Sequence, residues 1–584
     1  MPKEQLRLIL LTLLGSAMPS LEAALPTPKT EAPPSFALPT PKTEAPPSFA
    51  SDCGTISGEW VEAGGRIAAF SGIRYGRPPV GDLRWQPSLR VSCADVSMNA
   101  TVPGNVCWQD QTTFGQRSED CLNLNVFAPE AALQPGARAR PIVVWIYGGS
   151  LVLGAPISYG SIFSLVNALD VILVAPSYRL GMLGWAALPA LAARDVRQGS
   201  GGGNYGLTDQ INALQWVRRN AAALGGDAHA VTLMGQSSGG TSIVGLLLAP
   251  SASGLFQRAI SLSASPNITM GVPQKHSYDL QNFAARTRCT AAGDPACLLS
   301  LSPQEILAAT SEAYNSAPDV DLLPTGPSPA GLAWGPLLYV DGVTVREPSF
   351  PPSVAGLDVI LQSVLAEDAF VPNATVLAFD ADRALQFLVA HMSGFPDAAK
   401  LAHTLYTAYS AACSVDRGGE NCAPGGLVYE MASDVNVYCG NAQLASDLAR
   451  AGAHVYSSLW TAAPGRTLRM RNLDTAQECF RESDLPMHMI DFIWGAETFN
   501  TSGVTCAYTP TRSDIALGVG IRSVWRSMVH GQAVPWWKQA NATEFPPLNT
   551  ISHAYPQGFV GGSREALCKL WTDAGVGKSW WWIN

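Results

Sequence analysis

The chain of 584 residues is long enough to bury a large hydrophobic core, and its 47% hydrophobic and 14% charged residues are typical of a globular protein rather than a disordered one. Its 37 basic and 46 acidic residues give a formal net charge of −9, which argues against the basic surface that nucleic-acid binding requires. Length alone would allow several domains, although α/β folds often carry such length as insertions on one sheet.

The N-terminus has the pattern of a secretory signal peptide, which we assign to residues 1–23. Lys3 and Arg7 precede an apolar run at residues 8–14, and small residues follow it. An uncleaved membrane anchor is the alternative, but the run is shorter than a bilayer-spanning helix requires. We therefore expect a secreted protein without a transmembrane anchor.

A Pro-rich segment of 13 residues comes next and occurs twice without change, at residues 24–36 and 37–49. The repeat lacks the periodicity of a helix or a strand, so residues 24–50 are predicted to be a linker. A docking motif is the alternative. The folded domain is expected at residues 51–584.

Beyond the linker, short apolar runs alternate with helical stretches, a pattern that predicts a largely parallel sheet flanked by helices. Aliphatic and β-branched runs predict strands at residues 142–146, 171–175, 231–234 and 359–361. Residues 208–224 have apolar side chains at helical spacing before two glycines, which predicts a helix. The fold class is therefore α/β, with one large central sheet.

The pentapeptide GQSSG at residues 235–239 is a candidate nucleophile site. It follows the predicted strand at residues 231–234 and precedes an apolar, helical stretch at residues 243–248. A strand, a sharp turn and a helix in this order hold a serine hydroxyl exposed, and the helix directs N–H groups toward developing negative charge. Ser237 is the predicted nucleophile; a Gly/Ser turn without chemistry is the alternative.

Several longer motifs resemble the type-B carboxylesterase and cholinesterase family. They are FSGIRYG (residues 70–76), SEDCLNLNV (118–126), SYRLGMLG (177–184), GNYGLTDQ (203–210), ALQWV (213–217), GGD (225–227) and VTLMGQS (231–237). The resemblance covers about residues 53–575 and is strongest before residue 270. It implies an α/β-hydrolase fold with a single catalytic domain that acts on carboxylic esters. The chain departs from the family at Gln236 and Ser238, where Glu and Ala are more usual.

A glycine-rich turn at residues 148–150 resembles the oxyanion loop of the family. Acyl transfer places negative charge on the carbonyl oxygen, and backbone N–H groups must stabilise that charge. By resemblance, the donors are the N–H groups of Gly149, Ser150 and Ser238. Ser150 stands where a third glycine is usual, so its side chain is expected to alter which substrates fit. A glycine turn without this role is the alternative.

Activation of a serine hydroxyl requires a histidine as base and a carboxylate that orients the histidine. A segment similar to the family's acid loop implies that Glu367 is this carboxylate, with Asp368 as the rival. No histidine lies in a clean copy of the family's His-Gly-X-Glu/Asp pattern. Two alignments of that segment place the base at Pro486 or at Arg481, and His488 is the only histidine near either position. We predict His488 as the base; a lost base or another histidine is the alternative.

The twelve cysteines are expected to form disulfides, because the chain is predicted to be secreted and carries Asn-X-Ser/Thr sequons at Asn99, Asn267, Asn373, Asn500 and Asn541. The resemblance implies the pairs Cys107 with Cys121, Cys289 with Cys297, and Cys439 with Cys568. Proximity along the chain adds Cys53 with Cys93 and Cys413 with Cys422, which leaves Cys479 with Cys506. Zinc binding is disfavoured, since the chain has no Cys-X2-Cys motif or closely spaced histidine pair.

The predicted reaction takes a small ester as substrate and needs no metal or organic cofactor. The loop after Cys107 is short and lacks the tryptophan with which cholinesterases bind a quaternary ammonium, since Trp108 adjoins the cysteine itself. Choline esters are therefore disfavoured. A non-catalytic adhesion or binding protein on the same fold is one alternative, because the family includes such members, and a lipase acting on long-chain esters is another.

Overall fold

The computed structural model describes residues 45–93, 97–110, 115–160, 162–266, 268–289, 294–310, 323–326, 337–367, 373–416, 422–471, 479–498, 508–534, 536–560 and 564–576. The following predicted features lie outside these ranges: the signal peptide, most of the linker, Asp368, Cys506, Asn267 and Asn500. From Pro46 onward the chain forms one compact unit.

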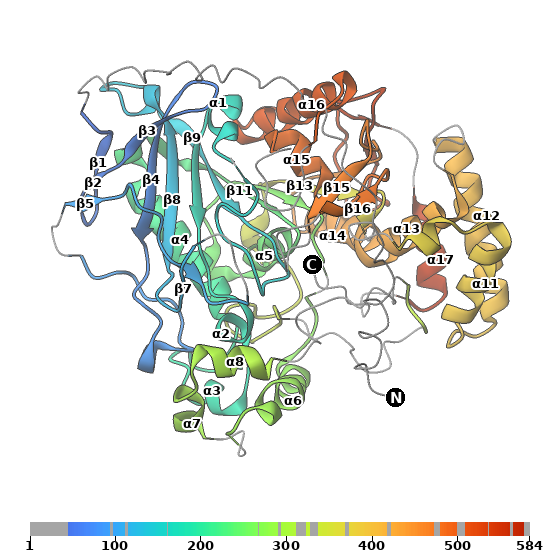
Figure 1. Ribbon diagram of the computed structural model, residues 1–584, viewed down its shortest axis with the longest axis horizontal. Coiled ribbons are helices and arrows are strands. Elements are labelled where there is room, and N and C mark those ends of the chain that lie inside the picture. Colours follow the sequence, from blue (N-terminus) through green and yellow to red (C-terminus); the bar gives the residue numbers. More distant parts are fainter. Residues whose placement is uncertain are drawn as a thin grey trace, which may run out of the picture. The chain divides into compact units, whose positions relative to one another are not determined.

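Eleven strands form the main sheet of the described residues (Figure 1). They are β3 (Glu59–Glu62), β4 (Arg66–Arg74), β8 (Asn123–Pro129), β9 (Arg140–Ile146), β10 (Ile172–Pro176), β11 (Gly226–Gln236), β12 (Arg258–Leu262), β13 (Asp358–Val364), β14 (His454–Trp460), β17 (Asn549–Ile551) and β18 (Phe559–Val560). Their order is β18-β17-β14-β13-β12-β11-β9-β10-β8-β4-β3. Neighbours from β17 to β10 pair in parallel, and antiparallel pairs complete both edges. The four strands predicted from sequence correspond to β9, β10, β11 and β13.

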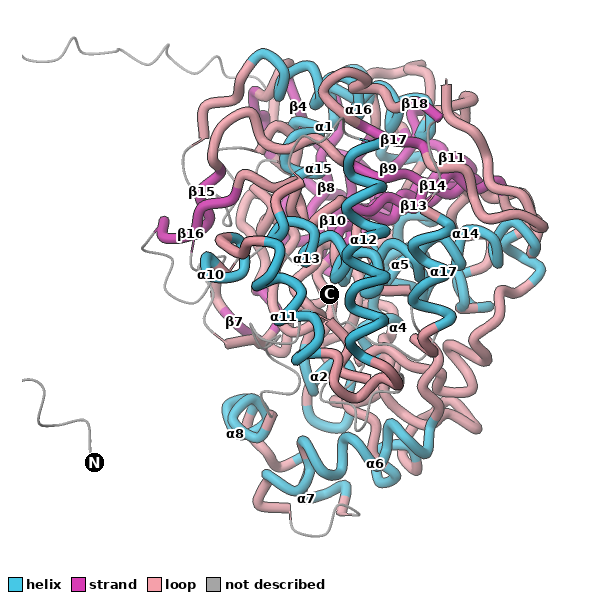
Figure 2. Tube along the Cα trace, turned by 90° about the vertical axis from the view of Figure 1, so that its right-hand side faces the viewer, coloured by secondary structure: helices cyan, strands magenta, loops and turns pink. Residues whose placement is uncertain are grey.

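The described residues form a set of helices, some of which cover both faces of this sheet while others lie away from it (Figure 1). They are α1 (Ser164–Leu169), α2 (Gly181–Trp185), α3 (Pro189–Ala192), α4 (Tyr205–Asn220), α5 (Ser238–Leu248), α6 (Val272–Asn282), α7 (Pro295–Leu299), α8 (Pro303–Ala309), α10 (Ala374–Leu377), α11 (Ala381–His391), α12 (Ala398–Asp416), α13 (Pro424–Ser433), α14 (Cys439–Arg450), α15 (Ile490–Ala496), α16 (Arg512–Val529) and α17 (Glu565–Asp573). Helices α4 and α5 lie on one side of the sheet, and α1 and α16 lie on the other (Figure 2). This is the predicted α/β-hydrolase architecture. Among the described helices, none combines the length and the apolar character needed to cross a membrane.

Burial of the central strands stabilises the sheet and fixes its register. Every residue of β8 and β10 is buried, and each large apolar side chain buried in this way contributes about 1.5–3 kcal/mol. In the parallel register, Gly235 of β11 lies opposite Ile146 of β9, while Gln236 lies opposite Leu262 of β12, which in turn faces Gln362 of β13. The carboxyl ends of these strands therefore meet at one edge, where open α/β sheets place their ligands.

The folded unit begins earlier than the sequence predicted. Ser48–Ser51 form β1, which pairs with β2 (Gly54–Ser57), and β5 (Met98–Asn99) completes this small sheet. Phe49 is buried, and its ring packs edge-on against that of Phe70 with the centroids 5.0 Å apart. Residues 48–50 of the predicted linker therefore belong to the domain, because Phe49 has an apolar partner there.

Five disulfides join residues of the described chain. The bonded pairs are Cys53 with Cys93, Cys107 with Cys121, Cys289 with Cys297, Cys413 with Cys422, and Cys439 with Cys568. The last pair spans 129 residues and ties α14 to α17. The remaining short sheets are β6 (Val106–Cys107) with β7 (Arg117–Ser118), and β15 (Leu468–Arg471) with β16 (Cys479–Ser483). Three sequon residues of the described chain, Asn99, Asn373 and Asn541, are exposed.

Candidate active site

Ser237 lies on a strained turn between β11 and α5. Its backbone dihedrals are φ 62° and ψ −133°, a combination that residues with side chains rarely adopt. The N–H of Ser237 donates to the Leu262 carbonyl at 2.8 Å, and the Ser237 carbonyl accepts from the N–H of Thr241 at 3.0 Å. Hydrogen bonds on both sides therefore hold the turn in this conformation, and the predicted order of strand, turn and helix is present.

Glycines around Ser237 allow the backbone segments to approach one another closely. A Cβ on Gly239 would lie 2.0 Å from the carbonyl oxygen of Ile146, and a Cβ on Gly235 would lie 2.7 Å from the backbone of Gly239. Gly148 lies two residues after the end of β9, and a Cβ on this glycine would lie 2.7 Å from Ser237 Cβ. These positions leave no space for a side chain, so the glycine pattern reflects the packing of β11 and α5 against the end of β9.

His488 and Glu367 are brought together by two segments that are 121 residues apart in the chain. Ala366 and Met487 form an isolated parallel bridge, which places the next residue of each segment side by side. His488 Nδ1 lies 2.6 Å from Glu367 Oε2. Glu367 is fully buried, and its Oε1 accepts the N–H of Val364 at 2.8 Å. These two hydrogen bonds hold the carboxylate in one orientation. Because a carboxylate can only accept, the imidazole proton of His488 lies on Nδ1.

The backbone after His488 explains why the family pattern is hard to recognise in the sequence. Met489 has φ 75° and ψ −11°, in the left-handed region that favours glycine. Residues 488–491 (HMID) therefore have the form of the His-Gly-X-Glu/Asp pattern, with methionine in the glycine position. It is His488 that meets the buried carboxylate.

A second carboxyl group, which the sequence analysis missed, lies close to this pair. Asp491 is fully buried; its Oδ2 accepts the side-chain amide of Gln362 at 2.6 Å, and its Oδ1 accepts the N–H of Phe492 at 2.8 Å. Burial raises the pKa of Asp491 to about 6; the hydrogen bond from Gln362 opposes this shift, and the nearby charge of Glu367 adds to it. Its position at the acidic end of the His-Gly-X-Glu/Asp pattern is the signal that could have identified it.

The other nitrogen of the imidazole faces the side chain of Gln236. The two Nε2 atoms, of Gln236 and of His488, lie 3.1 Å apart, and the Tyr159 hydroxyl donates to Gln236 Oε1 at 2.7 Å. Tyr159 thereby turns the NH2 of the amide toward the imidazole. Since Nδ1 donates to Glu367, Nε2 is the acceptor nitrogen, and the amide occupies the lone pair that a base would use. Among the described residues, no hydrogen bond joins Ser237 Oγ to this nitrogen.

Aromatic packing holds Tyr159 in this position. Its ring meets those of Trp145 and Phe492 edge-on, at centroid distances of 5.3 and 5.4 Å. Trp145 and Phe492 stack on one another at 4.3 Å. The orientation of the Gln236 amide therefore depends on a buried aromatic cluster that spans β9 and α15.

The predicted oxyanion loop follows β9 and has an unusual backbone. Gly149, Ser150 and Leu151 have φ values of 121°, 55° and 59°, so three consecutive residues lie at positive φ. Within the described chain, the N–H groups of Gly149, Ser150 and Ser238 make no hydrogen bond to protein acceptors, whereas Leu151 N–H donates to Ser238 Oγ at 3.1 Å. The loop is thus fastened to the first residue of α5 while the three predicted donors stay open.

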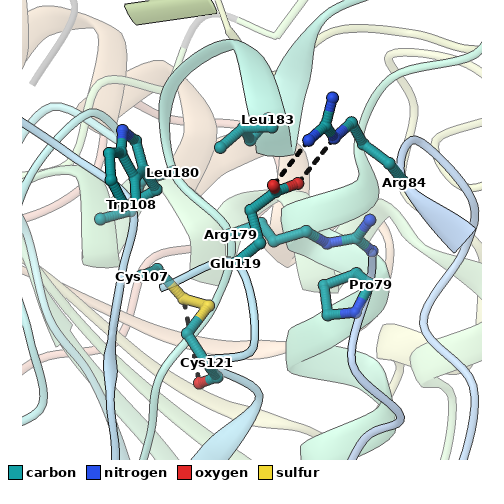
Figure 3. A pocket seen from close by; sticks show the side chains of 9 residues that line it. All are labelled: Pro79, Arg84, Cys107, Trp108, Glu119, Cys121, Arg179, Leu180 and Leu183. Carbon is teal, nitrogen blue, oxygen red and sulfur yellow. Dashed lines mark hydrogen bonds and ion pairs between the residues drawn. A yellow bond between two sulfur atoms is a disulfide. The ribbon is translucent and has the colours of Figure 1, made fainter. Parts of the chain in front are cut away.

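A small cavity lies beside the Cys107 disulfide (Figure 3). Arg84 closes one side of it with two hydrogen bonds to the Glu119 carboxylate, at 2.6 and 2.7 Å. The volume of about 10 Å³ holds roughly one water molecule, so this cavity is not a substrate site. The ring of Trp108, also at this cavity, lies 5.2 Å from the Arg117 guanidinium and is already covered by a cation of the chain itself.

A family model described as the Carboxylesterase family matches residues 45–502. Similar curated proteins include Carboxylesterase 1E of Mus musculus, which is 34% identical over 279 residues (44% of this chain and 48% of that protein). Cholinesterase of Mus musculus is 37% identical over 267 residues (42% and 42%), and para-nitrobenzyl esterase of Bacillus subtilis is 39% identical over 211 residues (34% and 40%). The chain spans about half the length of the curated relatives it matches.

Proposed function

Because this chain belongs to the carboxylesterase family, we propose that it hydrolyses carboxylic esters with Ser237 as nucleophile, His488 as base and Glu367 as the orienting carboxylate. The observation that carries the proposal is the 2.6 Å hydrogen bond between His488 Nδ1 and Glu367 Oε2, next to the strained turn of Ser237. The similar proteins named Carboxylesterase 1E and para-nitrobenzyl esterase support the same class of reaction.

In the proposed reaction, Ser237 Oγ attacks the carbonyl carbon of the ester and passes its proton to His488 Nε2. The N–H groups of Gly149, Ser150 and Ser238 stabilise the charge that develops on the carbonyl oxygen. His488 then gives the proton to the departing alcohol, which leaves the acyl group on Ser237. Water, deprotonated by the same histidine, attacks this acyl group and releases the carboxylic acid.

The Gln236 amide adds a step to the beginning of this cycle. Its N–H lies at His488 Nε2, so Ser237 has to displace the contact before the histidine can accept a proton. Gln236 also stands where the family usually has Glu, so the site carries one carboxylate fewer. The imidazolium formed during the reaction is then stabilised by the charges of Glu367 and Asp491.

We propose small, uncharged esters as substrates rather than choline esters. Trp108 is already covered by the Arg117 guanidinium, which disfavours a second cation on the same ring. The Ser150 side chain adds bulk to the oxyanion loop where the family usually has none. Hydrolysis of 3,3-dimethylbutyl acetate, an uncharged analogue of acetylcholine with a similar leaving group, is expected to be at least tenfold faster than that of acetylcholine, and the reverse order would contradict this substrate class.

A fluorophosphonate probe tests the nucleophile directly, because it labels an activated serine covalently. Native protein is expected to be labelled and to hydrolyse p-nitrophenyl acetate, and Ser237→Ala should lose both. Ser242→Ala is the matched control: this buried serine on α5 accepts a hydrogen bond from Gln210 at 3.1 Å and is outside the proposed machinery. Absence of labelling in the native protein would favour a binding protein, and a preference for emulsified long-chain esters would favour a lipase.

We further propose that the protein is secreted and glycosylated. Disulfides persist in oxidising compartments, and five join the described residues. Asn99, Asn373 and Asn541 are exposed, as acceptors of N-linked glycans must be. Treatment of protein collected from the medium of a eukaryotic host with an N-glycosidase should lower its mass, and an unchanged mass would contradict glycosylation.

A further inference from the structure

The oxyanion loop needs support from its surroundings. Ser150 and Leu151 both lie in the left-handed region, at φ 55° and 59°, although neither is a glycine. Side chains disfavour this region, and such conformations persist only where neighbouring groups hold them in place. Neighbouring groups must therefore hold the two ends of the loop.

The hydroxyl group of Ser238 holds the far end of the loop, and a tyrosine beside Ser238 holds the near end. The Ser238 Oγ accepts the N–H of Leu151, at the end of the loop, at 3.1 Å. The Tyr178 hydroxyl, beside Ser238, donates to the carbonyl of Tyr147, just before the loop, at 2.6 Å. Ser238 is fully buried, so water does not compete for these hydrogen bonds.

The aromatic pair at the near end of the loop is itself rigid. The rings of Tyr147 and Tyr178 stack with centroids 4.4 Å apart and planes 20° from parallel, and both residues are fully buried. Burial raises the pKa of Tyr178 well above its usual value, so its hydroxyl stays protonated and continues to donate. The near end of the loop, at the Tyr147 carbonyl, is therefore fixed by packing as well as by the hydrogen bond from Tyr178.

We propose that the Ser238 hydroxyl is a latch that positions the oxyanion loop, a role separate from that of the Ser238 N–H. The inference rests on the proposed function. Two departures from the family then compensate one another: a hydroxyl at position 238, where Ala is usual, holds a loop whose third glycine is replaced by Ser150. Ser238 carries both the latch hydroxyl and the third oxyanion donor, its own N–H. The latch therefore fixes the N–H groups of Gly149 and Ser150 relative to the N–H of Ser238.

The first test is Ser238→Ala, which removes the latch and keeps the N–H. We expect kcat for p-nitrophenyl acetate to fall about 10- to 100-fold while KM changes less than about twofold, because displaced donors act on the transition state more than on the bound ester. Inhibition by a trifluoromethyl ketone, whose adduct carries an oxyanion, should weaken by the same factor. Ser242→Ala, which removes a buried hydroxyl from the same helix, should change neither. A Ser238→Ala variant with native kcat and native ketone affinity would overturn the proposal.

The second test is rescue. Glycine adopts the φ of residue 150 without strain, so Ser150→Gly should reduce the need for the latch. The loss of kcat caused by Ser238→Ala is expected to be at least threefold smaller in the Ser150→Gly background than in the native one. A loss of the same size in both backgrounds would overturn the proposed compensation.

Hydrogen exchange separates this inference from the proposed function, because it needs no turnover. The amide of Leu151 is expected to be protected in the native protein and to exchange at least tenfold faster in Ser238→Ala, with no such change in Ser242→Ala. If the native protein proves inactive, faster exchange still supports the latch while the esterase assignment fails. Unchanged exchange at residues 148–151 overturns the latch whether or not the protein is active.

Discussion

Replacing Glu367 with glutamine removes one negative charge from the proposed site with almost no change in shape. Each oxygen of this carboxylate accepts one N–H, that of Val364 at 2.8 Å and that of His488 Nδ1 at 2.6 Å. The amide of glutamine offers a single acceptor oxygen. Its NH2 group must therefore face one of these two donors.

Both orientations of the new amide are unfavourable. An NH2 facing the Val364 N–H leaves two donors opposed, which costs about 1–3 kcal/mol in a buried site. An NH2 facing the imidazole forces the proton of His488 onto Nε2, where it meets the Gln236 amide and cannot be exchanged for the proton of Ser237. In either case the imidazolium formed in the reaction loses the charge of its nearest carboxylate.

We therefore expect Glu367→Gln to lower kcat for p-nitrophenyl acetate by about 10³- to 10⁴-fold, equivalent to about 4–5.5 kcal/mol of transition-state stabilisation. Asp368→Asn tests the rival carboxyl and should retain activity. Glu430→Gln is the matched control, since this buried glutamate accepts a hydrogen bond from Arg564 at 2.8 Å outside the site. Thermal unfolding of each variant separates misfolding from lost chemistry. A loss below tenfold for Glu367→Gln, or an equal loss for Asp368→Asn, would refute this reasoning.

Two further variants test the buried charge and the turn. Burial raises the pKa of Asp491 to about 6, so the folded state keeps a proton that the unfolded state, with a pKa of about 3.9, releases. The free energy of unfolding should therefore fall by about 2 kcal/mol from pH 4 to pH 6. Urea unfolding of Asp491→Asn should lack this part of the pH dependence, and an unchanged slope would contradict the assignment. Gly239→Ala places a Cβ 2.0 Å from the Ile146 carbonyl oxygen and should abolish labelling by the fluorophosphonate probe. Gly326→Ala, whose Cβ would meet nothing within 3.5 Å, should be labelled like the native protein.

Much of the fold was predictable because its signals are local. Strands β9 and β11 each contain a short, mostly aliphatic run, and the turn at Ser237 is marked by glycines that close packing requires. The start of the domain was not predictable in this way. The two copies of the 13-residue repeat are identical in sequence, and the second copy joins the domain through contacts with residues beyond the repeat, the pairing of β1 with β2 and the packing of Phe49 on Phe70.

The predicted base, His488, was difficult to place because the glycine of a sequence pattern stands for a backbone conformation. The glycine of the His-Gly-X-Glu/Asp pattern represents a left-handed residue, and here Met489 adopts that conformation at φ 75°. With this substitution allowed, the pattern identifies His488 and Asp491 together. The contact of Gln236 with the imidazole has no such signal, because it depends on Tyr159, 77 residues earlier in the chain.

The bridge between Ala366 and Met487 determines which parts of the site can move apart. It joins the segments of Glu367 and His488 into one unit at the end of β13, whereas Ser237 follows β11, with β12 between the two strands. Displacement of the segment that carries His488 would therefore change its distance to Ser237 while leaving the histidine and the glutamate in contact.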